Sequence, residues 1–476
     1  MTADPAPTAS TPDLDPEVCR RARLARDTRF DGLFFLAVRT TGIYCRPVCP
    51  ARPPAERNVA YFREASQAAA AGYRPCLRCR PETAPGSPAW QGSSVTVQRA
   101  LGLIRAGALN EGSLADLCAR LGVGERYLRK LFQRELGVSP VAVAHNQRLL
   151  FARQLLQETA LPIIDIAHAA GFGSVRRCNS AFQGSFGRPP GALRRPRQAN
   201  SNRAAIRLRL QYRPPYDWDG VLDFFSRHAV AGVESVDDQT YRRTILWQQQ
   251  PGEIRVRHLP ARQALELELR LPDLAAMMPV VQRVRRMFDL DANPAVIAAS
   301  LAQEPALASL LQRFPGLRSP VCWSVDEATV RAIVGQQVSI VAARTVCSRL
   351  ATAAAPGAGT ARAFPAPAAI AALEDSQFPM PARRRDTLRA VCGLLADGEA
   401  PGVTELLALP GIGPWTAAMV AMRGHGQPDA FPPRDLGLMR AWEALPQATL
   451  PLHEASGRWQ PWRAYAANLL WRSLGT

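Results

Sequence analysis

Four cysteines in two close pairs constrain the fold of this chain more than any other feature of its sequence. Cys45 and Cys49 form a C-x3-C pair, and Cys76 and Cys79 form a C-x2-C pair that begins 27 residues later. Two tight turns that each carry two thiols suit a tetrahedral zinc ion, with Zn–S bonds of about 2.3 Å. The spacing therefore predicts one bound Zn²⁺.

The predicted zinc site has two interpretations. Most closed all-thiolate sites only hold a fold together. Four thiolates on one divalent ion nevertheless carry a net negative charge, and the thiolate is the nucleophilic form of cysteine. An exposed sulfur of this cluster is therefore also a candidate to attack an electrophilic carbon.

The remaining cysteines and the start of the chain indicate a cytoplasmic protein. The chain has ten cysteines, and its first residues, MTADPAPTASTPDLDP, lack the basic and apolar regions of a signal peptide. Without export, a disulfide framework is not expected. The six scattered cysteines are instead expected to be small buried apolar residues.

Charge and hydropathy favour a nucleic-acid partner and no membrane. No stretch approaches the roughly 18 uninterrupted apolar residues that a membrane span needs. The formal net charge is +18, and residues 1–200 carry 28 basic against 15 acidic side chains. The amino-terminal part is therefore expected to be the stronger polyanion binder.

The pattern along the 476 residues predicts a multidomain chain that is mostly α with α+β parts. A pattern of helix, Gly-containing turn and helix occurs twice, at 113–136 and at 162–186. Three other segments alternate apolar and polar residues, as antiparallel strands do: AIRLRLQY, EIRVRHL and ALELELRL. The expected segments are a flexible tail (1–20), a zinc domain (21–88), a domain with two helix-turn-helix units (93–197), a small antiparallel α+β domain (203–285) and a helical domain (286–476).

The stretch from ARDTRFDGLFF to RPCLRCRPE closely resembles the amino-terminal domain of the Ada adaptive-response family, with all four cysteines present. The resemblance implies that Cys45 is both a zinc ligand and the acceptor of a methyl group from DNA methylphosphotriesters, and that Cys49, Cys76 and Cys79 complete the site. It also implies contacts to the DNA backbone, which we expect from Thr41, Arg52, Arg74 and Arg78. The alternative for these four is ordinary surface or turn residues.

Residues 93–197 resemble the AraC-type regulatory domain, including AHAAGFGSVRRCNSAFQGSFGRPPGALRR. In that fold the second helix of each unit enters the major groove. The candidate recognition helices are therefore 125–135 and 174–184. The side chains expected to contact DNA are Arg126, Arg129, Arg176 and Arg177. Cys178 stands where many relatives have Phe.

The sequence LPGIGPWTA at 409–417 is typical of a helix-hairpin-helix, in which Gly411 and Gly413 let the backbone approach a DNA phosphate. For the hairpin by itself, the less favoured alternative is a passive DNA anchor. Residues 203–476 resemble the AlkA family of DNA-3-methyladenine glycosylases from end to end, through YRPPYDW, IVGQQVS and DAFPPRDLGLMRAW.

This second resemblance implies monofunctional base excision by water. Asp435 is the expected catalytic carboxylate. A helix N-cap is its alternative role, and both roles can hold at once. Trp415 and Trp471 are expected to stack on the flipped base. Gln337 stands where a member of the family inserts an apolar wedge, and Met419 replaces a pocket Tyr.

The backbone carbonyls of Leu407, Leu409 and Ile412 are expected to hold a monovalent cation. A lysine-dependent lyase is not expected, because the only lysine is Lys130.

Taken together, the resemblances predict an Ada/AlkA-type fusion that senses alkylation, regulates transcription and excises bases such as 3-methyladenine. The expected partners are double-stranded DNA, both alkylated and at promoters, and RNA polymerase, bound by a monomer. The competing interpretation is a transcription regulator with a structural zinc ion, whose glycosylase half is only a non-specific DNA clamp. No PCHR-type motif occurs, so repair of O6-alkylguanine is not expected.

Overall fold

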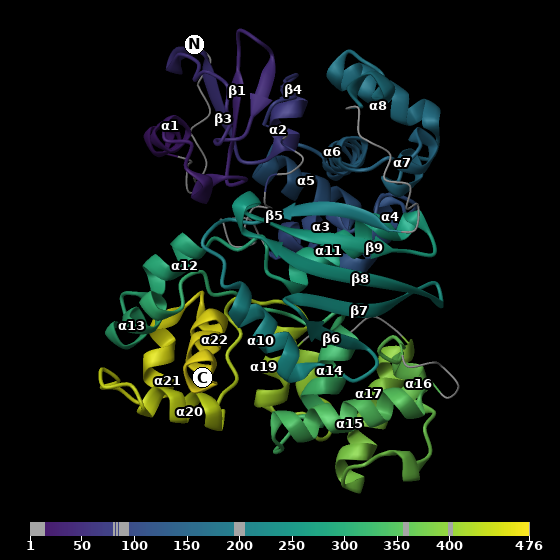
Figure 1. Ribbon diagram of the computed structural model, residues 1–476, viewed down its shortest axis with the longest axis vertical. Coiled ribbons are helices and arrows are strands. Elements are labelled where there is room, and N and C mark those ends of the chain that lie inside the picture. The colour runs from purple at the N-terminus through teal and green to yellow at the C-terminus, as the bar shows by residue number, and fades with distance from the viewer. Residues whose placement is uncertain are drawn as a thin grey trace. The chain divides into compact units, whose positions relative to one another are not determined.

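The computed structural model describes residues 15–79, 81, 84, 95–194, 205–355, 361–397 and 403–475. Their contacts divide the chain into two compact units (Figure 1), one made of residues 1–213 with 273–282 and the other of residues 214–272 with 283–476. The boundaries predicted at 203 and 286 therefore differ from the units, because residues 203–213 and 273–282 group with the first unit.

The predicted tail of residues 1–20 is wrong for its last part. Helix α1 (Pro16–Leu24) begins at Asp15, whose carboxylate accepts a hydrogen bond from the Glu17 N–H at 2.8 Å. Pro at the first helical position and an Asp N-cap are strong helix-start signals. Cys19 is buried within this helix. Residues 1–14 lie outside the described part.

A small sheet in the order β3-β1-β2-β4 carries the cysteines of the first unit. Strand β1 pairs antiparallel with β2 and β3, and β2 pairs parallel with β4. Helix α2 (Ala65–Ala70) packs against this sheet, with Tyr44, Ala65 and Ala68 in the shared core. The strands span β1 (Phe35–Val38), β2 (Ile43–Cys45), β3 (Val59–Phe62) and β4 (Arg74–Pro75).

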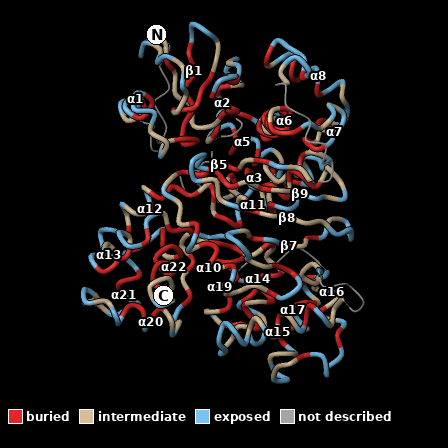
Figure 2. Tube along the Cα trace, in the orientation of Figure 1, coloured by how far each residue is buried: buried red, intermediate tan, exposed pale blue. Residues whose placement is uncertain are grey.

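Both predicted helix-turn-helix units are present in the first unit. The first is α4 (Leu114–Leu121) and α5 (Glu125–Leu136), and the second is α7 (Ile163–Ala169) and α8 (Val175–Phe186). The long helix α6 (Pro140–Glu158) connects them and is largely buried (Figure 2). The unit is completed by α3 (Val95–Arg105), α9 (Pro190–Leu193) and β5 (Ile206–Gln211).

The second unit combines an antiparallel sheet with helices. Each strand from β6 to β9 pairs antiparallel with the next, and β8 and β9 match two of the predicted strands. The alternating segments 234–237 and 240–247 add two strands that the sequence analysis did not name. The strands are β6 (Glu234–Asp237), β7 (Thr240–Trp247), β8 (Gln250–Leu259) and β9 (Ala264–Arg270).

The helices of the second unit surround a core that includes Ile333, Leu388, Leu406 and Val420. Helix α14 packs closely against α19 and α17. The helices are α10 (Trp218–His228), α11 (Met277–Met287, whose first residues group with the first unit), α12 (Pro294–Leu301), α13 (Pro305–Arg313), α14 (Val325–Val334), α15 (Ile340–Ala353), α16 (Pro367–Ala371), α17 (Ala382–Asp397), α18 (Val403–Leu407), α19 (Pro414–Arg423), α20 (Leu436–Glu443), α21 (Leu452–Ala455) and α22 (Arg463–Leu474). Among the described residues, no helix is both long and apolar enough to cross a bilayer.

Candidate metal centre and base-excision pocket

The four predicted zinc ligands come together at the ends of two parallel strands. The register of β2 with β4 pairs Ile43 with Arg74 and Tyr44 with Pro75, so Cys45 and Cys76 follow side by side. All four sulfur atoms, including those of Cys49 and Cys79, lie within 4.8 Å of one another. A tetrahedral ion with Zn–S bonds of about 2.3 Å places its sulfurs about 3.8 Å apart. The donor set therefore fits Zn²⁺, and the centre binds one such ion.

Backbone N–H groups and a buried arginine support this centre. The N–H of Arg46 donates to Cys79 Sγ at 3.3 Å, and the N–H of Arg78 donates to Cys76 Sγ at 3.4 Å. Such donors stabilise negative charge on sulfur. The Arg46 guanidinium forms a buried ion pair with Asp31 and also donates to the Cys79 carbonyl at 3.1 Å. Sequence analysis missed Arg46, because nothing in the spacing separates it from the surface arginines.

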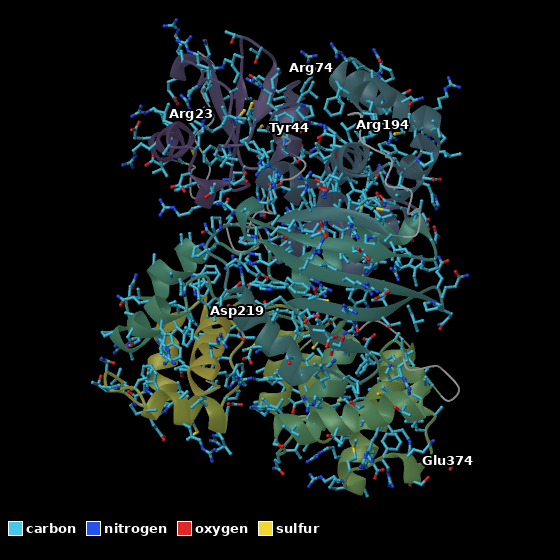
Figure 3. All side chains as sticks on the ribbon, viewed as in Figure 1. Arg23, Tyr44, Arg74, Arg194, Asp219 and Glu374 are labelled. Carbon is cyan, nitrogen blue, oxygen red and sulfur yellow. The ribbon has the colours of Figure 1, made fainter. Side chains whose placement is uncertain are left out.

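The four residues expected to contact the DNA backbone around the centre are exposed. They are Thr41, Arg52, Arg74 and Arg78, of which Arg74 is labelled in Figure 3. Among the thiols, Cys45 is only 8 % exposed, and Cys49 is the more exposed of the first pair. The surface near the thiols therefore carries cationic side chains suited to phosphates.

The predicted arginines are exposed on the candidate recognition helices. Arg126 and Arg129 are exposed on α5, and Arg176 and Arg177 are exposed on α8. Arg129 also pairs with Glu125, one turn earlier in α5, at 2.8 Å. Cys178 lies on the buried face of α8, and burial raises the pKa of its thiol to about 11. Cys178 is therefore a core residue, as its position in the motif indicates.

Asp435 lies at the meeting point of two indole rings. Its Oδ2 accepts a hydrogen bond from Trp415 Nε1 at 2.8 Å, and its Oδ1 accepts one from Trp471 Nε1 at 3.0 Å. The same Oδ1 also accepts from the Leu438 N–H at 2.9 Å and caps α20. The cap and a fixed carboxylate at the pocket therefore coexist. Asp429, the other nearby carboxylate, is engaged by the Arg463 guanidinium at 2.7 and 2.8 Å.

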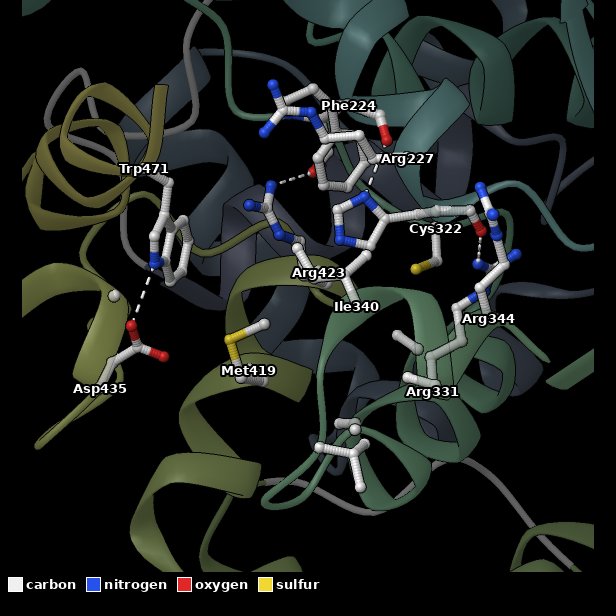
Figure 4. A pocket seen from close by; sticks show the side chains of 18 of the residues that line it. Phe224, Arg227, Cys322, Arg331, Ile340, Arg344, Met419, Arg423, Asp435 and Trp471 are labelled. Atoms are coloured by element: carbon white, nitrogen blue, oxygen red, sulfur yellow. Dashed lines mark hydrogen bonds between the residues drawn. The ribbon is translucent and has the colours of Figure 1, made fainter. Parts of the chain in front are cut away.

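A pocket of about 1450 Å³ opens beside this carboxylate (Figure 4). Trp415, Met419 and Arg423 line it from α19 at intervals of four residues, so they share one face of that helix. Trp471 lines it from α22. Gly437 permits this packing, because a Cβ there would lie 3.2 Å from Trp471 Nε1. Sequence analysis missed Arg423, although helical spacing from Met419 was available as a signal.

Gln337 lies at the exposed turn between α14 and α15, on the rim of the same pocket. Its φ of 54° is in the left-handed region. The preceding side chain, Gln336, donates to the Gly411 carbonyl and to Thr416 Oγ1, both at 3.0 Å. This pair of contacts fixes the turn against the hairpin. Val338 and Ile340 are exposed apolar neighbours of Gln337 that sequence analysis did not name.

The hairpin glycines differ in their surroundings. Gly411 has a φ of +83°, and a Cβ there would lie 2.2 Å from Thr387 Oγ1, whereas a Cβ on Gly413 would meet nothing within 4 Å. The open backbone at Gly413 begins α19. Of the three carbonyls expected to hold a cation, that of Leu409 accepts the Ile412 N–H at 3.1 Å, and Leu407 ends α18.

Buried charges in the wall of the pocket hold the sheet to α14. Burial alone would raise the pKa of Glu234, but Arg331 and Arg243 lower it to about 2. Arg243 contacts Glu234 at 3.0 Å and also pairs with Glu327. Burial lowers the pKa of His228 to about 4, so this imidazole is neutral at pH 7. The carboxylates of this network are thus already engaged by guanidinium groups.

Comparisons with known proteins match each part of the chain. A family model described as the metal binding domain of Ada matches residues 18–82, a helix-turn-helix domain matches 117–196, and the AlkA N-terminal domain matches 207–324. The chain is 40% identical to the "Probable bifunctional transcriptional activator/DNA repair enzyme AlkA" of Mycobacterium tuberculosis, covering 97% of each protein.

Two relatives from Escherichia coli match separate parts. "DNA-3-methyladenine glycosylase 2" is 30% identical, over 56% of this chain and 97% of that protein. "Bifunctional transcriptional activator/DNA repair enzyme Ada" is 40% identical, over 29% of this chain and 36% of that protein. These matches confirm the resemblances on which the predicted domain types rest.

Proposed function

This chain belongs to the family of bifunctional transcriptional activator/DNA repair enzymes that join Ada and AlkA domains, and on that premise we propose how its residues divide the work. The first unit accepts methyl groups from DNA and regulates transcription. The second unit excises alkylated bases such as 3-methyladenine by hydrolysis. The observation that carries the second activity is the Asp435 carboxylate held by Trp415 and Trp471 at the pocket wall.

Methyl transfer is assigned to Cys45. Its sulfur attacks the methyl carbon of a methylphosphotriester, an S–C bond forms, the C–O bond breaks, and the electron pair remains on the phosphate oxygen. The bound zinc ion keeps the thiols deprotonated at neutral pH. Conversion of one thiolate to a thioether removes one negative charge from a surface that faces phosphates, so DNA affinity rises.

Transcriptional control is assigned to the two candidate recognition helices, α5 and α8. Their exposed arginines, together with those around the zinc centre, supply contacts to phosphates and base edges of a promoter. We further propose that the protein acts as a monomer in the cytoplasm and binds RNA polymerase. The name "transcriptional activator" borne by the relatives supports the contact with polymerase. The proposed DNA contacts are Thr41, Arg52, Arg74, Arg78, Arg126, Arg129, Arg176 and Arg177.

Base excision is assigned to the pocket of the second unit. The flipped base stacks on Trp415 and Trp471 above Met419, and Gln337 fills the gap in the duplex. Gly411 and Gly413 bring the hairpin backbone to a phosphate, and the carbonyls of Leu407, Leu409 and Ile412 hold a monovalent cation. As the glycosidic bond breaks, the sugar becomes cationic, and the negative charge of Asp435 stabilises it.

Base release by the Asp435→Asn variant tests this assignment. Asn keeps an oxygen that caps α20 but removes the negative charge, so we expect release of 3-methyladenine from alkylated DNA to fall about 100-fold or more. Thermal unfolding of the variant serves as the control for folding. A wild-type protein that releases no base would instead support the regulator whose second unit is a DNA clamp.

Peptide mapping by mass spectrometry tests methyl transfer. After incubation with DNA that contains methylphosphotriesters, we expect one methyl group per chain, located on Cys45. The mapping must separate Cys45 from the more exposed Cys49. Methylation of another cysteine would refute the assignment to Cys45, and an unchanged mass would show that the zinc site is structural only.

A further inference from the structure

Three arginines at the mouth of the excision pocket are exposed and pair with no carboxylate of the described residues. Among the described side chains that line this pocket, the exposed arginines are Arg383, Arg434 and Arg440. None of the ion pairs between described residues includes any of the three. A guanidinium group stays charged at neutral pH. We call these three side chains the arginine rim.

Several less exposed arginines of the same pocket differ from the rim, because their charges are already matched. Arg227 pairs with Asp223 at 2.9 Å, and Arg472 pairs with the same carboxylate at 3.2 Å. Arg331 pairs with the buried Glu234. These guanidinium groups are engaged within the protein, whereas the charges of the arginine rim are available to an anion from outside.

The arginine rim reaches the pocket from two directions. Arg383 lies in the first turn of α17, whereas Arg434 directly precedes Asp435 and Arg440 lies in α20. Helices α17 and α20 lie on opposite sides of α19, the helix that carries Trp415 (Figure 1). A DNA strand that delivers one nucleotide to the pocket therefore meets guanidinium groups on both sides of that nucleotide.

The Asp435 carboxylate gives these cations a physical role. The negative charge that stabilises a cationic sugar also repels the phosphates on either side of the flipped nucleotide. Trp415 and Trp471 donate hydrogen bonds to Asp435, but neutral indoles do not offset this repulsion. A guanidinium group attracts a phosphate and can form two parallel hydrogen bonds with it. The rim thus counteracts the repulsion between the carboxylate and the strand that it acts on.

We propose that the arginine rim binds backbone phosphates of the damaged strand on both sides of the flipped nucleotide. The inference rests on the proposed base excision and adds binding residues to it. The hairpin glycines, Gly411 and Gly413, offer the DNA a backbone contact, and the rim adds charged contacts. Because phosphates carry no sequence information, the rim binds the strand without distinguishing one damaged base from another.

The salt dependence of base release tests the rim. Single-turnover release of 7-methylguanine from a duplex, measured at increasing protein concentration, gives the affinity of the productive complex. Each phosphate contact adds about 0.9 to the slope of log affinity against log salt. Between about 50 and about 200 mM salt, we expect wild-type affinity to fall about 3.5-fold further than that of Arg383→Gln, Arg434→Gln or Arg440→Gln, and about 40-fold further than that of the triple variant.

Arg458→Gln is the matched control. Arg458 is also exposed and belongs to no ion pair between described residues, but it is not among the described residues that line the pocket. Its replacement lowers the net charge by the same amount, and we expect it to keep the wild-type salt dependence. Urea unfolding checks that each variant folds. The same loss of salt dependence in Arg458→Gln as in Arg383→Gln would show a general effect of charge and overturn the inference.

Neutral methylphosphonate linkages on either side of the 7-methylguanine identify the bound anion as a DNA phosphate. At about 50 mM salt, we expect them to lower wild-type affinity about threefold or more, and to lower the affinity of the triple variant less than about 1.5-fold. The linkages remove the charge that the rim binds, so the two changes are not additive. Equal losses in both proteins would overturn the assignment of the rim to these phosphates.

The results separate this inference from the proposed function. Rim variants that keep the wild-type salt dependence would overturn the role of the rim and leave base excision intact. A wild-type protein that releases no alkylated base would overturn the proposed excision and this inference with it.

Discussion

Asp435 caps a helix and also carries the carboxylate to which we assign catalysis, two roles that the sequence analysis expects to be compatible. One oxygen caps α20 and accepts from Trp471, and the other accepts from Trp415. A carboxylate held by three donors cannot rotate away from its position without losing several hydrogen bonds. The cap therefore contributes to the orientation of the group that the proposed reaction needs.

The two hairpin glycines predict opposite effects of the same substitution. Gly411→Ala places a methyl group against Thr387 at a positive φ, and we expect it to lower the free energy of unfolding by about 2 kcal/mol. Gly413→Ala meets open space and should leave stability unchanged while weakening DNA binding, because the methyl group blocks the approach of a phosphate. Urea unfolding and DNA titration distinguish them, and equal stability losses would contradict the prediction.

Asp289 makes stability depend on pH. Burial raises its pKa to about 6, against the nearby charge of Arg318, while its Oδ2 accepts hydrogen bonds from Tyr465 Oη at 2.8 Å and the Ser319 N–H at 3.0 Å. Its ordinary pKa is 3.8. As the pH falls from 6 toward 4, the folded chain binds a proton that the unfolded chain does not, so this group becomes less destabilising.

The Asp289→Asn variant isolates this effect, since Asn tolerates the left-handed φ of 50° at this position. Between pH 7 and pH 4.5, we expect wild-type stability to rise relative to the variant by about 2 kcal/mol. Urea unfolding of both proteins across this range measures the difference. A difference that stays constant with pH would show that Asp289 does not titrate as described.

At the scale of elements, α6 joins the zinc module to both helix-turn-helix units. Its Leu150 packs in one core with Phe35 and Tyr44 of the small sheet. Its fully buried Arg153 donates to the Cys76 carbonyl at 2.8 Å and lies over the ring of Phe186 in α8. Helix α6 thus contacts both a zinc-ligand loop and the candidate recognition helix α8.

Leu150→Ala tests the packing of α6 on the zinc module. The substitution leaves a cavity in the shared core, and we expect it to lower the free energy of unfolding of the first unit by about 3 kcal/mol. Val141→Ala, on an exposed position of the same helix, is the matched control and should change stability by less than about 0.5 kcal/mol. Similar effects of the two substitutions in urea unfolding would argue against this packing.

At the scale of the whole molecule, the two proposed chemistries lie in different units. The four zinc ligands lie in the first unit, and all residues that line the excision pocket lie in the second. Folding of a small metal module depends on its ion. Loss of zinc should therefore affect the first activity and spare the second.

Chelation measures this separation. After zinc removal with 1,10-phenanthroline, we expect methyl transfer to be lost and base release, measured at saturating DNA, to change less than about twofold. Zinc added back should restore methyl transfer. A parallel loss of both activities would show that the pocket requires the zinc module.

The sequence alone predicted the parts that depend on local spacing. Two cysteine pairs predict a metal site, two helix-turn-helix patterns predict a DNA-binding domain, and a Gly-Ile-Gly turn predicts a helix-hairpin-helix. In each case residues that are close along the chain fix the geometry. The start of α1 at Asp15 was equally local, yet the Pro/Ala-rich composition before it obscured the cap signal.

Only the tertiary structure determined which distant side chains share an environment. Three arginines show this, because each is separated by tens of residues from its partner: Arg46 contacts Cys79, Arg153 contacts Cys76, and Arg423 lies over the Trp471 ring. Among so many arginines, the sequence alone does not distinguish these three. Arg423 differs from a surface cation in two ways: it is buried, and it forms no ion pair with a carboxylate of the described residues. Both are properties of the folded surroundings, because desolvation and Coulomb interactions depend on distance in space and not along the chain.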